Sequence, residues 1–209
     1  MRDRLHLRTL MAVLLAFALG VTAVASGQET GFRIVIVTFR GCEEACEGFK
    51  DYVDQWEEDA EVTVLDVARD LDTIPAIRDE VLSLDPDLLV TWGTSVTLGM
   101  IGTVDATDPA LISNIPTVFM IVADPVGAEI VTSYEAPGRT WVTGTRNRVP
   151  EATQMRVLSE YRAFDRIGVL YNDDELNAVL KAEEIRGVGK LEGFEVVTRI
   201  VRTDRKSVV

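Results

Sequence analysis

Apolar residues fall into short β-branched runs that alternate with amphipathic stretches. Continuous apolar runs bounded by Pro, Gly or Asp are typical of strands buried on both faces. The sequence predicts such strands over residues 32–39, 61–67, 87–91, 117–122, 140–145, 166–171 and 194–201. Apolar residues at helical spacing predict helices over 43–58, 71–84, 95–101, 126–134, 150–161 and 179–191, with loops over 105–114 and 172–177. Single helices between strands predict an α/β protein with parallel sheets and right-handed crossovers.

The stretch 115–128 contains the strand with the clearest boundaries. The run 117–122 ends in a turn at Ala123-Asp124-Pro125, and a helix is expected to begin at Pro125 or Val126. In open α/β sheets the ligand site lies outside the carboxyl ends of the strands, and Asp124 sits at such an end. Asp124 is therefore expected either to cap the following helix or to receive a ligand ammonium group.

Two other strand ends carry candidate binding groups. The turn Gly93-Thr94-Ser95 opens a helix, where free N–H groups, hydroxyls and the helix dipole suit a carboxylate, although an ordinary N-cap has the same residues. Arg40 and Glu43 follow the first strand and either contact a ligand or remain solvated charges. Trp92 either stacks on an apolar ligand or packs in the core.

The strand–helix units divide the chain into two unequal parts. Residues 31–145 contain enough units for a complete first α/β lobe, with a crossing point at the strand 140–145. Residues 146–209 hold little more than strand–helix–strand, whereas a matching lobe needs roughly 100 residues. We expect a partial second α/β lobe over 146–209, a C-terminally truncated chain, and a ligand cleft between the lobes.

The N-terminus has the pattern of a secretory signal peptide over residues 1–25. Arg2, Arg4 and Arg8 precede an apolar run over 9–25, with a plausible cleavage site after Ala25. The alternative is an uncleaved anchor helix, for which the run is short. The only histidine, His6, lies in this segment. The exported chain is thus expected to be periplasmic, to lack the commonest general base, and to bind no histidine-ligated zinc.

The net charge and the cysteine content exclude several classes of partner and function. The net charge of −13 argues against nucleic acid or an anionic membrane as a partner. Cys42 and Cys46 are the only cysteines, and in an exported protein a disulfide is expected, with free thiols as the alternative. A metal site would need two further ligands, so neither a metal nor a cofactor is expected. The chain also has no G-x-S-x-G, P-loop or G-x-G-x-x-G motif, which argues against an exported enzyme.

Several segments together form a recognisable pattern: Ile115-Pro-Thr-Val-Phe, Asp124-Pro-Val-Gly-Ala, Pro137-Gly138, Val142-Thr-Gly144 and the segment 168–177. This pattern resembles the periplasmic substrate-binding components of ABC transporters, in the branch that includes tryptophan- and tyrosine-binding proteins. It implies a type I periplasmic-binding fold, in which two Rossmann-like lobes close on a ligand. The chain departs from the family pattern at Glu129, where the family has glycine, and also at 139–140 and 173–178.

The resemblance also implies site residues and partners. It implies that Thr94 and Ser95 bind the carboxylate of the ligand, and that the second lobe contributes Tyr171, Asn172, Glu175 and Asn177. It implies a monomeric binding protein that captures an amino acid or similar carboxylate, delivers it to a membrane permease and performs no chemistry. The alternative is an extracytoplasmic sensory domain of a signalling system.

Overall fold

The structure is a computed structural model that describes residues 31–56 and 59–201, so the predicted signal peptide lies outside the described residues. All described elements belong to one compact unit, Phe32–Val209. They are, in chain order, β1 Phe32–Thr38, α2 Glu44–Trp56, β2 Ala60–Asp66, a 3-10 turn η1 Leu71–Thr73, α3 Ile74–Leu84, β3 Leu88–Trp92, α4 Thr94–Ile101, β4 Thr117–Val122, β5 Val142–Arg146, α5 Glu151–Tyr161, β6 Arg166–Tyr171, α6 Leu176–Glu192 and β7 Glu195–Ile200. Within these residues no helix has the length and apolar character needed to cross a bilayer.

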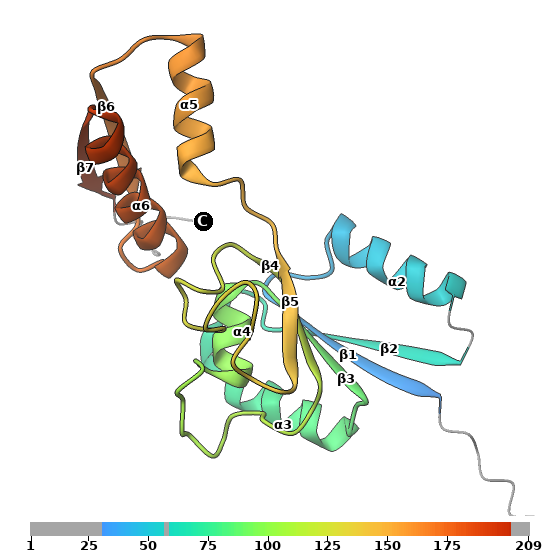
Figure 1. Cartoon of the computed structure of the whole chain (residues 1–209). Helices are drawn as coiled ribbons and strands as arrows, with labels where there is room; N and C mark the ends of the chain where they lie inside the picture. The colour runs from blue at the N-terminus through green and yellow to red at the C-terminus, as the bar shows by residue number, and fades with distance from the viewer. Residues whose placement is uncertain (1–30, 57–58, 202–209) are drawn as a thin grey trace, which may run out of the picture. The chain divides into compact units, whose positions relative to one another are not determined.

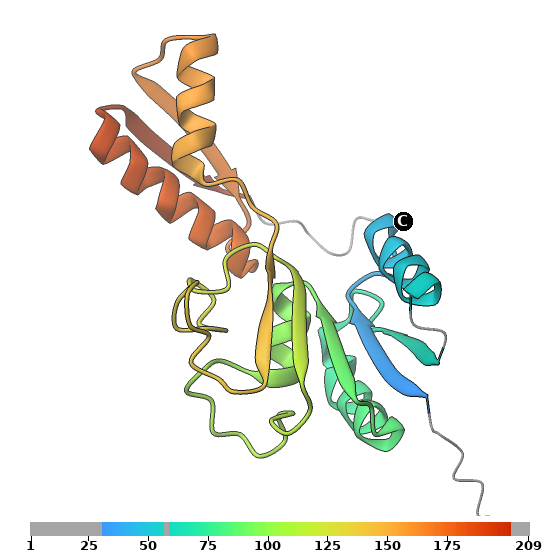
Figure 2. The same cartoon turned by 45° about the vertical axis from the view of Figure 1, so that its right-hand side comes forward.

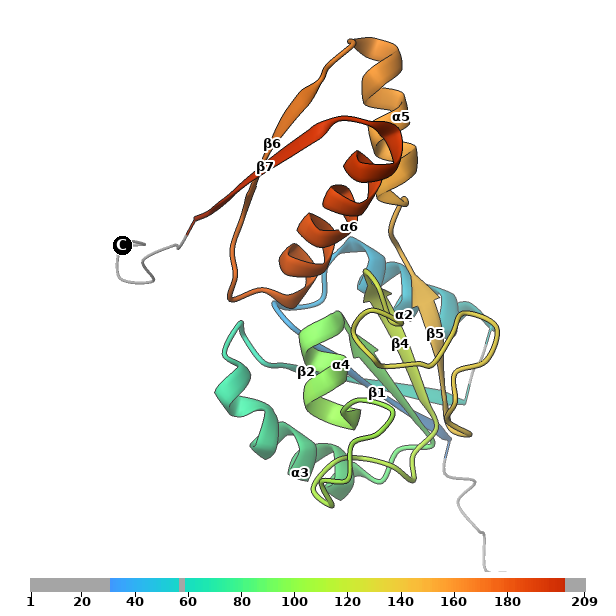
Figure 3. The same cartoon turned by 60° about the vertical axis from the view of Figure 1, so that its left-hand side comes forward.

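The first sheet is parallel throughout, in the order β2-β1-β3-β4-β5. Helices α3 and α4 cover one face and α2 lies on the other (Figures 1 and 3). Strands β1 and β3 are almost fully buried between these layers, which explains their continuous apolar sequences. We call residues 32–146, with this sheet, the first lobe.

The second sheet is a parallel pair, β6 with β7. Helix α6 connects the two strands and packs against both, and α5 packs against α6 (Figure 2). We call residues 151–200 the second lobe and residues 147–150 the crossing segment. The predicted α/β class with parallel sheets is confirmed, whereas the predicted lobe boundaries stay predictions.

The predicted helix over 126–134 is wrong. The segment after Asp124 forms turns, in which the N–H groups of both Ile130 and Val131 donate to the carbonyl of Pro125, at 2.9 and 3.2 Å. Glu129 has a φ of 56°, in the left-handed region, and this conformation ends any helical propagation. The capping signal at Asp124-Pro125 is therefore real, but it initiates a turn.

Helix α6 begins three residues earlier than predicted. The sequence places a loop over 172–177, whereas the helix runs from Leu176. Asn177 consequently lies on the first turn of a helix and is held in place by it.

Glu129 provides a direct test of the turn. A residue with a Cβ in the left-handed region is strained by about 1–2 kcal/mol, and glycine avoids that strain. Glycine also loses more conformational entropy on folding, which reduces the gain by about 0.5–1 kcal/mol. The side chain of Glu129 is exposed, so little packing is lost on replacement. We expect Glu129→Gly to raise the free energy of unfolding by about 0.5–1 kcal/mol in urea titrations. Glu135→Gly, at an exposed position outside the left-handed region, should not stabilise the protein.

The carboxyl end of β4 is irregular just before Asp124. The register between β4 and β5 shifts between Phe119 and Val122, and Ile121 has a φ of 56°, which is unusual for a β-branched residue. Such bulges bend a strand and redirect the side chains that follow. The bulge thus sets the direction in which the chain enters the turn at Asp124.

Candidate functional site

Thr94 and Asn177 bring the two lobes into direct contact. Gly93, with a φ of 95°, turns the chain from β3 into α4, and no side chain caps the start of this helix. Thr94 is buried at that start, and its Oγ1 donates to Oδ1 of Asn177 at 3.0 Å. Ser95 is exposed on the same first turn of α4. The structure therefore places one predicted residue from each lobe together, beside a helix N-terminus that favours negative charge.

The Asp124 carboxylate accepts hydrogen bonds from within the segment that follows it. Its Oδ1 accepts the Gly127 N–H at 2.9 Å and the Tyr134 hydroxyl at 3.0 Å. Burial raises the pKa of Tyr134, and the hydrogen bond to the Asp124 carboxylate raises it further. A Cβ at Gly127 would meet the Asp124 carboxylate and Leu180 of the second lobe, so a larger residue there would displace the Asp124 side chain. Asp124 thus caps a turn, and its contact with a ligand stays a prediction.

Arg148, in the crossing segment, is the centre of a charged cluster. Its side chain is only 6% exposed. Its Nε donates to Oε1 of Glu151 at 2.9 Å and its Nη2 donates to Oε2 of Glu184 at 2.5 Å, while Nη1 lies 3.9 Å from Oδ2 of Asp124. Lys181 Nζ lies 3.6 Å from Oε1 of Glu151. One guanidinium group therefore contacts carboxylates of both lobes.

The pKa values of the two glutamates of this cluster are shifted in opposite directions. Glu151 is fully buried, and burial acts to raise its pKa, but hydrogen bonds from Arg148 and Glu184 and the Arg148 charge outweigh burial and lower it. The pKa of Glu184 is raised, first by burial and then by its hydrogen bond with Glu151. The hydrogen bond and the charge of Arg148, with the hydrogen bond from Glu184, thus favour the ionised form of a carboxylate in the protein interior.

The other predicted site residues make local contacts. Arg40 pairs with Glu43 at 3.0 Å, and both are exposed. Tyr171 lies under the guanidinium of Arg186, 6.0 Å from the ring centre to Cζ. Asn172 accepts the Asp174 N–H at 3.0 Å, and Glu175 occupies the position before α6 without capping it. Trp92 is buried in the core, in agreement with the packing alternative. Ligand binding by Arg40, Ser95, Tyr171, Asn172 and Glu175 stays a prediction.

Both cysteines are joined at the start of α2. Cys42 and Cys46 form a disulfide with a Cα–Cα distance of 5.1 Å, and Cys46 is fully buried against the sheet. The disulfide closes the loop that follows β1, so it holds the Arg40 turn against the start of the helix.

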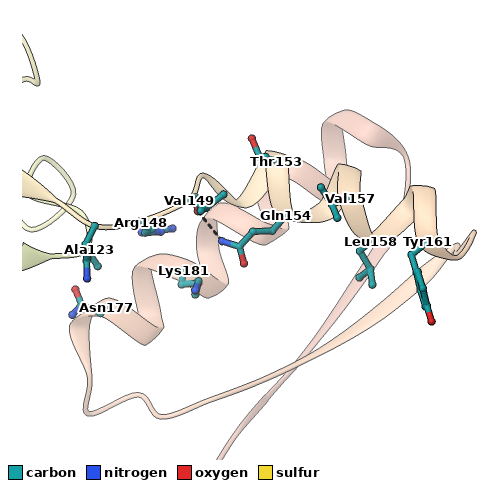
Figure 4. Close-up of a pocket in the computed structure, with 11 residues that line it drawn as sticks. Ala123, Arg148, Val149, Thr153, Gln154, Val157, Leu158, Tyr161, Asn177 and Lys181 are labelled. Atoms are coloured by element: carbon teal, nitrogen blue, oxygen red, sulfur yellow. Dashed lines mark hydrogen bonds between the residues drawn. The ribbon is translucent and has the colours of Figure 1, made fainter. Parts of the chain in front are cut away.

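A pocket of about 800 Å³ lies beside the crossing segment (Figure 4). One wall is a face of α5 with Val157, Leu158 and Tyr161, and Gln154 of that helix donates to the Val149 carbonyl at 2.7 Å. The other lining residues are Ala123, Asn147, Arg148, Val149, Thr153, Asn177 and Lys181. The pocket therefore combines an apolar wall with a cationic, amide-bearing end. Asn177 is the one predicted ligand residue among those that line it.

Arg148, Glu151 and Glu184 were not predicted from the sequence. The spacing of three between Arg148 and Glu151 at a helix start was a usable signal, but the sequence separation of 33 between Glu151 and Glu184 hides the tertiary contact. Arg139, which departs from the family pattern, was also missed. Its guanidinium donates to the carbonyls of Ile101, Gly102 and Thr103, and so caps the carboxyl end of α4.

Together these features define a class of protein. Two lobes with parallel sheets are joined by a crossing segment. Thr94 after β3 contacts the second lobe, and Asp124 after β4 contacts Arg148 of the crossing segment. This is the arrangement of type I periplasmic-binding folds. Residues 34–207 match the family model described as ABC transporter substrate binding protein, so the chain belongs to the ABC transporter substrate-binding protein family.

Individual proteins share part of the sequence or the fold of this chain. The chain is 32% identical over 91 residues to a tyrosine-binding protein of Clostridioides difficile, an alignment that covers 43% of this chain and 26% of the relative. A conserved domain protein of Vibrio cholerae matches in structure with a TM-score of 0.68 and 23% identity, over 83% of this chain and 58% of the other. An ABC domain of Streptococcus pneumonia in complex with L-Trp has a TM-score of 0.66 and 20% identity, over 82% and 57%. The chain thus spans little more than half the length of these solved structures.

Proposed function

We propose that this protein binds an aromatic amino acid between its lobes, at the contact between Thr94 and Asn177, and delivers it to a membrane permease without chemical conversion. The observation that carries the proposal is the hydrogen bond from Thr94 to Asn177 at the uncapped start of α4. The family and the neighbouring structures are binding proteins, which supports a role without catalysis. An extracytoplasmic location follows from the same proposal.

The chemistry of the residues supports an amino-acid ligand with an apolar side chain. A helix N-terminus and the Ser95 and Thr94 hydroxyls suit a carboxylate. The pocket beside Asn177 offers an apolar wall from Val157, Leu158 and Tyr161 for an aromatic ring. Two relatives point the same way, because one is named as a tyrosine-binding protein and another holds L-Trp.

Calorimetric titration of the purified protein with L-tyrosine, L-tryptophan and L-lysine tests the proposal. We expect binding of the two aromatic amino acids and not of L-lysine. In the proposed complex the Thr94 hydroxyl donates its single proton to the ligand carboxylate in place of Asn177. Thr94→Val keeps the shape of the side chain but removes this hydrogen bond to a charged group, which is worth about 1.5–3 kcal/mol, so affinity should fall about 10- to 100-fold. Thr107→Val, in an exposed loop of the first lobe, is the matched control and should bind normally. Equal affinity of Thr94→Val and the unmodified protein would contradict the assigned site.

A further inference from the structure

The crossing segment carries a buried cation with partners in both lobes. The contacts of Arg148 with Glu151 and Glu184 anchor its guanidinium to α5 and α6 of the second lobe. Its third contact, to Asp124, reaches the end of β4 in the first lobe. A planar guanidinium offers several donors in a fixed geometry, so it links these carboxylates more rigidly than an ammonium group does.

The first-lobe end of this link is itself immobilised. Oδ1 of Asp124 is held by Gly127 and Tyr134, which leaves Oδ2 directed at Arg148. Asp124 therefore cannot follow a movement of Arg148 without losing its own hydrogen bonds. At 3.9 Å the Arg148–Asp124 contact is at the limit of an ion pair, so a rotation that carries Arg148 away from Asp124 takes the two groups out of ion-pair distance.

Helix α6 connects this link to the candidate ligand site. Glu184, which binds Arg148, lies two turns from Asn177, which accepts the hydrogen bond from Thr94. A helix of this length moves as a rigid element, so the position of Glu184 relative to Arg148 determines where Asn177 meets the first lobe.

We propose that Arg148 is a positioning residue that holds the lobes in the arrangement in which Thr94 meets Asn177, and thereby sets the ligand affinity of the site between them. The second half of this statement rests on the proposed function, whereas the first half concerns the unliganded protein alone. Arg148 acts through the orientation of α6 and does not need to touch the ligand.

The test measures the distance between the lobes without ligand. Spin labels are placed at two exposed positions, by D79C in α3 of the first lobe and E160C in α5 of the second. Pulsed electron resonance should give one dominant distance for the otherwise unmodified protein. In Arg148→Lys the charge beside Glu151 is kept but the fork geometry is lost, so we expect a second distance population and about tenfold weaker ligand binding, a typical coupling between sites. Asp124→Asn, which removes the charge from the first-lobe arm, should give the same second population.

A matched control separates positioning from a general loss of an ion pair. Arg166→Lys alters the exposed Arg166–Glu195 pair, which lies wholly in the second lobe, and should leave the distance and the affinity unchanged. An unaltered distance distribution in both Arg148→Lys and Asp124→Asn would overturn the proposal, even if amino acids bind. A second distance population in these variants supports the positioning role of Arg148. If the protein shows that population but binds no amino acid, the proposed function is wrong and the positioning role stands.

Discussion

Arg148→Met is expected to lower the free energy of unfolding by about 3–5 kcal/mol, measured by urea titration at pH 7. The reason is the full burial of Glu151, whose carboxylate loses its closest cation when the guanidinium is removed. Uncompensated buried charges are costly because the interior does not solvate them. Lys181 remains 3.6 Å from Glu151, so the lower end of the range is the better expectation.

Two comparisons identify the buried charge as the cause. The double variant Arg148→Met with Glu151→Gln should regain at least about half of the lost stability, because residues in one ion-pair network act non-additively. Arg166→Met, which breaks an exposed pair with Glu195, should cost no more than about 1 kcal/mol. An additive double variant would show that packing of the arginine stem, and not charge, explains the loss.

The same variant should show a pH dependence of definite sign. In the unmodified protein hydrogen bonds from Arg148 and Glu184 and the Arg148 charge together outweigh burial and lower the pKa of Glu151. Once Arg148 is removed, we expect burial to raise that pKa above its unfolded value. A group with a raised folded pKa contributes stability that is present at low pH and is lost as pH rises through that pKa. The deficit of Arg148→Met should therefore be smaller near about pH 5 than near about pH 8.

Gly144→Ala is expected to destabilise the protein by about 3 kcal/mol in the same titration. Gly144 of β5 lies opposite Phe119 of β4, and an added Cβ would meet both the ring and the backbone carbonyl of Phe119. Phe119 is buried in the core, so its ring cannot move aside without creating a void. Backbone atoms yield still less than side chains.

Gly168→Ala is the matched control, since Gly168 also lies in a strand but has open space where the Cβ would be. We expect it to change stability by at most about 1 kcal/mol, in the stabilising direction, because alanine has less freedom in the unfolded chain. Equal effects of the two alanines would show that close packing is not the reason for the glycine of the Val142-Thr-Gly144 segment.

The strands were largely predictable because burial on both faces leaves a local signal. The run 117–122 reproduces the bounds of β4, and 166–171 those of β6, since continuous β-branched sequence has few other uses. The turn after Asp124 was mispredicted because its local signals, Asp followed by Pro, are those of a helix start. Only the φ of 56° at Glu129, a residue with no sequence preference for that region, decided against a helix.

The candidate site divides in the same way. Residues at strand ends, such as Thr94 and Asp124, could be named from the sequence because parallel sheets place ligands at that edge. Contacts between distant residues could not be predicted from the sequence, since Asn177 lies 83 residues from Thr94 and Glu184 lies 36 residues from Arg148. The sequence by itself determined the α/β class, the strands and most of the helices, and the likeness to a family of binding proteins. Only the tertiary structure showed that Arg148 is buried among carboxylates of both lobes, because folding brings charges that are distant in the sequence into ion-pair contact.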